Sequence, residues 1–69
     1  MSNLTIDYFM SKAMSMAEVA FKNHEVPVGA VIVKDGRIIG KGFNQVIEKN
    51  SVSSHAEINA INDASQTIQ

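Results

Sequence analysis

The sequence contains no cysteine, no tryptophan and only one proline, and these absences narrow what the chain can be. Without cysteine, no disulfide can reinforce a small core, and no thiolate from this chain can bind a metal. No apolar run approaches the ~18 residues of a membrane-spanning helix, and the polar start lacks the basic and apolar regions of a secretory signal. We therefore expect a soluble, cytoplasmic protein without a membrane partner.

A strong charge of either sign is also missing. Six Lys and Arg against seven Asp and Glu give a net charge of −1, which argues against a strongly basic nucleic-acid-binding domain. Locally, Lys34, Arg37, Lys41 and Lys49 outnumber the acidic residues, which fits a solvated sheet edge and loop or a phosphate-contacting patch. A single domain of this size, spanning residues 1–69, buries only about 60 % of its unfolded surface, so its fold is marginal alone.

The first third of the chain has the apolar spacing of a helix. Asp7 is a suitable N-cap, and the periodicity predicts a helix over 8–22. Its expected core face is Phe9, Ala13, Met16, Ala17, Ala20 and Phe21. We interpret Met10, Met14 and Met16 as flexible core filler. Pro27 prevents the helix from continuing, because proline lacks a backbone donor.

A β-hairpin is predicted next. Residues 26–33 are apolar and mostly β-branched, which is typical of a strand buried on both faces. Asp35-Gly36 between two apolar runs predicts a two-residue turn, and 38–43 form the return strand. Glycines at two positions of that strand, Gly40 and Gly42, indicate a bulge or the close approach of another element.

Residues 45–53 read as a polar loop, and a second helix is predicted to begin near His55 and to weaken after Ile61. The expected order is therefore helix, β-hairpin, loop, helix, in the α/β class. Two strands cannot close a sheet, so an open strand edge remains that invites pairing. The chain resembles the front half of a larger α/β layer that lacks its later strands and helices.

His55 and Glu57 are the residues most able to carry chemistry. Side chains two apart on a helix diverge, so these two can flank one site but cannot bind one atom together. In a functional interpretation, His55 is a zinc ligand and Glu57 moves a proton. In a structural one, Ser54 and Glu57 form a capping box at the start of the helix.

The motifs around this triplet resemble those of the zinc-dependent nucleoside and nucleobase deaminases, most closely the bacterial tRNA adenosine deaminases. They are Glu25-Val26-Pro27-Val28-Gly29-Ala30, the turn at Asp35-Gly36, Gly42-Phe43-Asn44, and His55-Ala56-Glu57 followed by Ile58 and Ala60-Ile61. Together these motifs span nearly the whole chain. The resemblance implies a partial three-layer cytidine-deaminase-like fold and a hydrolytic deamination that converts the wobble adenosine of tRNA to inosine.

The resemblance also implies individual roles. His55 would be the first zinc ligand, and Glu57 would shuttle protons during attack of zinc-bound hydroxide on C6 of adenine. Asn44 would bind the target nucleoside, the Ala56 backbone would border the base, and Val28 would line its pocket. The implied partners are the tRNA anticodon loop and, in the full-length parent, a second copy of the same protein.

The sequence departs from this family in one decisive respect. The family's second zinc motif, Pro-Cys-x-x-Cys, is absent, and a catalytic zinc needs about three protein ligands plus water. We therefore expect the chain to be the N-terminal part of a deaminase and to be inactive alone. The alternatives are a cytosine- or guanine-type deaminase, or a non-enzymatic module that docks on another chain through its open sheet edge.

Overall fold

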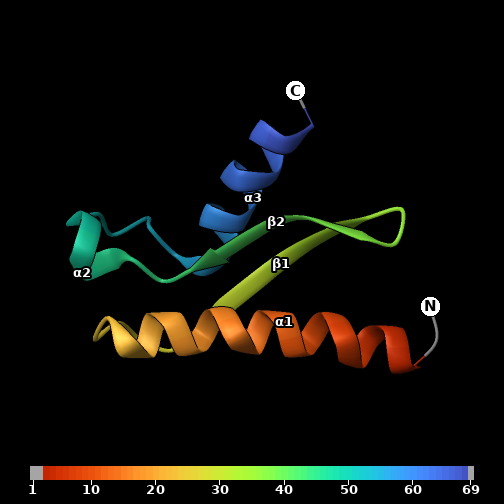
Figure 1. The fold of residues 1–69 in the computed structure, drawn as a ribbon. Coiled ribbons are helices and arrows are strands. Elements are labelled where there is room, and N and C mark those ends of the chain that lie inside the picture. The colour runs from red at the N-terminus through yellow and green to blue at the C-terminus, as the bar shows by residue number, and fades with distance from the viewer. Residues whose placement is uncertain (1–2, 69) are drawn as a thin grey trace.

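The structure, a computed structural model, describes residues 3–68. In chain order its elements are α1 (Asn3–Lys22), β1 (Gly29–Lys34), β2 (Arg37–Phe43), α2 (Val46–Lys49) and α3 (Ala56–Thr67). The two long helices lie on opposite faces of the β1-β2 hairpin (Figure 1). This is the predicted three-layer α/β arrangement of helix, hairpin, loop and helix. Among the described residues, no helix is both long enough and apolar enough to cross a membrane.

Helix α1 begins earlier than the sequence predicted and ends where it was expected. Asp7 lies inside the helix, so its prediction as an N-cap is wrong. No glycine or proline interrupts this first stretch, and the helix therefore extends through it. At the other end, the His24 amide donates to the Phe21 carbonyl and the Glu25 amide to the Ala20 carbonyl, with His24 at φ 62°. These bonds form a Schellman motif, which closes the helix.

The contact of α1 with the sheet is a narrow stripe of small residues. A Cβ on Gly29 would collide with the α1 backbone at Ala13 and Ala17, so β1 and α1 approach closely there. Phe9, Ala17 and Ala20 are buried as predicted. The prediction is wrong for three other apolar residues, which are mostly exposed: Met10 (58 %), Met14 (60 %) and Phe21 (69 %). They belong to an apolar face that is wider than the stripe that the hairpin covers.

The hairpin confirms the predicted turn. Lys34 pairs with Arg37, and Asp35 and Gly36 between them both have positive φ (52° and 77°), as a type I′ turn requires. Strand β1 starts at Gly29 instead of Val26, and most of its side chains are half-buried, so burial on both faces was overestimated. The register shifts after Ile32, which marks the bulge that the glycines indicated.

Helix α3 lies directly on the backbone of β2. A Cβ on Gly40 or Gly42 would collide with α3 backbone atoms, including those of Ala60. The buried residues of α3 are the alanines Ala56, Ala60 and Ala64. The glycines of β2 and the alanines of α3 therefore permit the close approach of another element that was predicted from Gly40 and Gly42. The helix continues to Thr67 through the residues that were expected to weaken it.

The segment 45–53, predicted as a loop, contains the short helix α2. The carboxylate of Glu25, which is buried, accepts hydrogen bonds from the amides of Ile47 (3.0 Å) and Glu48 (2.8 Å). A carboxylate satisfies the free amides at a helix start and is favoured by the helix dipole. The partner lies 22 residues earlier in the chain, so local sequence patterns did not reveal this helix.

Candidate functional site

His55 and Glu57 lie at the start of α3, as predicted. His55 is the N-cap residue, with φ −82° and ψ 156°, and Glu57 is in the first turn. Both side chains are exposed. The capping box is not formed, because the helix start has no side-chain cap hydrogen bond and the Ser54 amide donates to the Ser51 carbonyl. Glu57 is therefore not engaged in helix capping.

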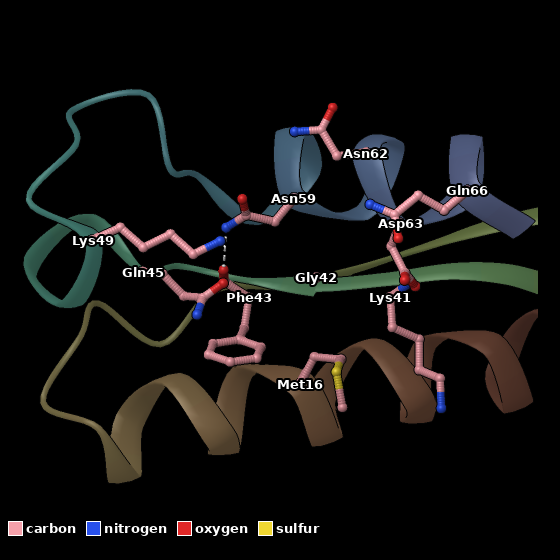
Figure 2. A pocket seen from close by; sticks show the side chains of 10 residues that line it. All are labelled: Met16, Lys41, Gly42, Phe43, Gln45, Lys49, Asn59, Asn62, Asp63 and Gln66. Atoms are coloured by element: carbon pink, nitrogen blue, oxygen red, sulfur yellow. Dashed lines mark hydrogen bonds between the residues drawn. The ribbon is translucent and has the colours of Figure 1, made fainter.

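The side chain of Ser54 is hydrogen-bonded to Asn59 instead of capping the helix. Asn59 Nδ2 donates to the Phe43 carbonyl (2.8 Å), the Ser54 carbonyl (3.3 Å) and Ser54 Oγ (3.1 Å). Figure 2 shows the first of these bonds, which joins α3 to the end of β2. Asn59 thus fixes the turn that precedes His55. Sequence reasoning missed Asn59, although a polar residue within an Ala- and Ile-rich helix start was the available signal.

Asn44 connects the end of β2 to the start of α3. Its side-chain Oδ1 accepts a hydrogen bond from the backbone N–H of Ala56 at 2.8 Å. Its backbone N–H donates to the Val28 carbonyl at 3.2 Å. Asn44 is 7 % exposed, Ala56 is fully buried and Val28 is 40 % exposed. The structure therefore brings together the three residues predicted to bind a nucleoside, next to the first turn that carries Glu57.

The described residues do not provide a complete metal site. Across residues 3–68, no group of three or more His, Cys, Asp and Glu side chains lies close enough to hold a metal ion. Zinc at a catalytic site takes about three protein ligands. His55 offers one exposed imidazole and the sequence has no thiolate, so the residues present do not fit zinc without ligands from elsewhere.

The two flanks of α3 differ in character. Since a helix turns by about 100° per residue, Glu57 shares one flank with Ile61. The opposite flank carries Asn59 and Asp63. The Asp63 carboxylate accepts a hydrogen bond from the Lys41 amide at 2.8 Å, so this second flank lies against the outer edge of β2. Glu57 therefore projects from the side of α3 that faces β1.

An open groove of about 580 Å³ lies along the β2 edge. It is lined by Met16, Lys41, Gly42, Phe43, Gln45, Lys49, Asn59, Asn62, Asp63 and Gln66 (Figure 2). Its lining includes neither His55 nor Glu57. The groove is on the Asp63 flank of α3, whereas Glu57 is on the other flank.

Comparison with known proteins identifies the family of this chain. Residues 4–69 match the family model described as the cytidine and deoxycytidylate deaminase zinc-binding region, so the chain belongs to this deaminase family. It is similar to the tRNA-specific adenosine deaminases of Streptococcus pyogenes (51 % identity over 57 residues) and Rickettsia bellii (51 % over 61 residues). These matches cover 83 % and 86 % of this chain but only 36 % and 42 % of the two relatives.

Solved structures give the same fold. A structure of a tRNA:A34 deaminase, from work on A-to-I editing at the wobble position, superposes with a TM-score of 0.86 at 42 % identity. The guanine deaminase of Bacillus subtilis superposes with a TM-score of 0.83 at 36 % identity. The chain covers 48 % and 42 % of these proteins. The resemblance predicted from the motifs is thus confirmed, and the chain spans less than half of the relatives it matches.

Proposed function

We propose that this chain is the N-terminal part of a deaminase domain that, when complete, converts the wobble adenosine of a tRNA anticodon loop to inosine in the cytoplasm. The observation that carries this proposal is the hydrogen bond between Asn44 and the Ala56 amide. It links the strand end beside Val28 to the helix turn that bears His55 and Glu57. The similarity to tRNA-specific adenosine deaminases supports adenosine in tRNA as the substrate.

Each residue has a role that its surroundings support. The Ala56 amide holds Asn44 Oδ1, and within residues 3–68 the Asn44 Nδ2 group makes no hydrogen bond, so it can donate to a nucleoside. The exposed part of Val28 offers an apolar surface to a base. Glu57 is exposed and engaged in no cap, which leaves its carboxylate able to accept and deliver protons as ammonia leaves.

The chain alone is proposed to be inactive. Zinc belongs to the chemistry of this family, and this chain contributes a single matched ligand, His55. A homodimer of this chain would not complete the site, because two copies still contain no cysteine. The catalytic domain therefore needs the segment of the relatives that this chain does not span. We further propose that the complete domain forms a homodimer.

A second candidate is deamination of guanine or cytosine. The superposition with a guanine deaminase, at a TM-score close to that of the tRNA enzyme, favours keeping this candidate. The two candidates share Glu57 as proton carrier and differ in the base that the completed pocket accepts. Substrate comparison on one complete domain separates them.

The test is a chimera in which this chain is joined to the part of the Streptococcus pyogenes relative that follows the matched stretch. We expect the purified chimera to convert adenosine to inosine in an anticodon stem-loop and to leave guanine and cytidine unchanged. Glu57→Gln keeps the shape of the side chain but removes its proton transfer, and should lower kcat by about 10²-fold or more. Inosine is measured by nucleoside chromatography after digestion.

Glu18→Gln is the matched control, because Glu18 is an exposed carboxylate on α1, far from the start of α3 in sequence. It should leave the rate unchanged. A chimera that folds and binds zinc but does not act on adenosine contradicts the assignment. Preference for guanine or cytidine moves it to the second candidate. Activity of the isolated 69-residue chain would refute the proposed need for the remaining segment.

A further inference from the structure

Two of the basic residues that lie close together in the sequence also line the groove along the β2 edge. Lys49 and Lys41 lie towards its two ends (Figure 2). Both side chains are exposed, and within residues 3–68 neither forms an ion pair. The acidic residue of the lining, Asp63, accepts a hydrogen bond from the Lys41 backbone amide. The two ammonium groups are therefore available to an anion.

This groove continues into two smaller ones. Towards α1, a second groove shares Met16 and Lys41 with it and adds Lys12. Towards the loop before α3, a third groove shares Lys49 with it and adds Ser54. We call the three together the basic groove. It runs from α1 along β2 to the loop before α3 and contains three lysines.

One end of the basic groove reaches the candidate site. Its lining there includes Ser54 and Ile58. Ser54 directly precedes His55, and Ile58 directly follows Glu57. A linear molecule with one unit held at His55 and Glu57 can therefore continue across the loop before α3 into the groove.

Uncharged polar groups make up much of the remaining lining of the basic groove. They are carboxamides and hydroxyls, among them those of Ser15, Gln45, Ser53, Asn62 and Gln66. Within residues 3–68, the side chains of Asn62 and Gln66 make no hydrogen bond and can donate to a ligand. Lys, Ser, Asn and Gln are residue types that contact phosphate and sugar in nucleic-acid complexes. Three lysines against one carboxylate also complement the charge of a phosphodiester backbone.

We propose that the basic groove binds the RNA backbone next to the target adenosine, outside the pocket that holds the base. Lys12, Lys41 and Lys49 bind phosphates, while Asn62 and Gln66 donate to phosphate or ribose oxygens. The three positive charges are spread along the groove, which fits a linear polyanion better than a single small anion. This inference rests on the proposed function and adds a second contact surface for its RNA substrate.

The 69-residue chain contains the whole basic groove, so binding is tested on this chain itself. Fluorescence anisotropy of a labelled anticodon stem-loop measures the affinity at several salt concentrations. We expect the affinity to fall as salt rises, and the triple variant Lys12→Gln, Lys41→Gln, Lys49→Gln to lower it at least about tenfold. Each single substitution should reduce the slope of log affinity against log salt by about 1.

The matched control removes the same number of positive charges outside the groove, by Lys22→Gln, Lys34→Gln and Arg37→Gln. All three residues are exposed, and none lines the basic groove. Screening limits their influence, so the affinity should change less than about twofold. Lys49→Arg keeps the charge and should keep the affinity. Circular dichroism of each variant alone checks that it folds as the unchanged chain does.

The chimera described above gives a second measurement. The triple groove variant should raise KM for the stem-loop at least about tenfold and leave kcat unchanged, because the groove contacts RNA that does not react. A merely structural effect of the substitutions would lower kcat as well.

Absence of stem-loop binding by the chain overturns the proposal, and so does equal weakening by the groove and control variants. A lower kcat at unchanged KM overturns it as well. The chimera also separates this inference from the proposed function. Lysine-dependent binding together with a chimera that folds and loads zinc but does not act on adenosine refutes the function alone. An active chimera that the triple groove variant leaves unchanged refutes the groove alone.

Discussion

The outer edges of β1 and β2 differ in their hydrogen bonding and in the side chains beside them. On the β2 side, the Lys41 amide at the strand edge is bonded to Asp63, and Asn59 holds the end of the strand through the Phe43 carbonyl. On the β1 side, no strand of the described residues pairs with the outer edge, and exposed apolar side chains of α1 and α3 flank it. Among the described residues, one side of the hairpin is thus closed by hydrogen bonds, whereas the other keeps an unpaired strand edge beside exposed apolar side chains.

The two sides also differ in the residues that α3 presents. Glu57, the residue proposed to move protons, projects from the β1 side of α3. The groove with Lys41 and Lys49 lies on the β2 side. The residues proposed to carry the chemistry therefore do not line the largest polar feature of the β2 side.

The largest loss of stability is expected from Gly42→Ala, which disrupts the packing of α3 on β2. The added Cβ would meet backbone atoms of Ala56 and Ala60, which cannot move aside as a flexible side chain can. We expect a loss of about 3 kcal/mol, the upper part of the usual range for an added group in a packed core. In a marginal fold this should abolish the cooperative urea transition followed by circular dichroism.

Gly36→Ala is the control for that experiment. Nothing lies within 4 Å of an added Cβ there, but φ is +77°, so the cost should be roughly 1 kcal/mol from backbone strain alone. If Gly42→Ala were no more harmful than Gly36→Ala, α3 would not rest on the β2 backbone. The β2 side would then be less tightly packed than the structure indicates.

Local chemistry made parts of this fold predictable. The turn at Asp35-Gly36 needs positive φ at adjacent positions, and Asp-Gly supplies it. Gly40 and Gly42 are costly in a strand unless something needs the space, so the approach of α3 could be expected. Helix α2 could not be predicted from local sequence, because Glu25, which stabilises it, lies 22 residues earlier in the chain.

The errors about the core and the site have a different cause. Periodicity identified the apolar face of α1, but it does not reveal which part of that face this chain itself covers, so Phe21 was assigned to the core. At the site, His55 and Glu57 were correctly placed at a helix start. Whether Ser54 and Glu57 form a capping box depended on Asn59, which binds the Ser54 hydroxyl and is itself held by the Phe43 carbonyl 16 residues earlier in the chain.

A smaller effect is expected from Asp63→Ala, which would make the β2 side resemble the β1 side. The Lys41 amide loses its acceptor, at a cost of about 1 kcal/mol. The freed strand edge can then pair with another chain, so self-association should increase. Urea denaturation measures the first effect and sedimentation velocity the second. Asp63→Asn retains a carbonyl acceptor and should change both less, and unchanged association of the alanine variant would show that Asp63 does not protect the edge.

The smallest effect on stability is expected from Phe21→Ser on the β1 side, and its matched control is Phe9→Ser on the same helix. Phe21 is 69 % exposed and Phe9 is 8 % exposed. In the isolated chain, Phe21→Ser should therefore change the free energy of unfolding by less than about 0.5 kcal/mol, as exposed substitutions usually do. Phe9→Ser should cost about 3 kcal/mol, because it empties a core position, and should abolish the cooperative urea transition as Gly42→Ala does. Urea denaturation compares the two. If Phe21→Ser instead destabilised the chain as much as Phe9→Ser, Phe21 would belong to the core of this chain and would not lie on its exposed face.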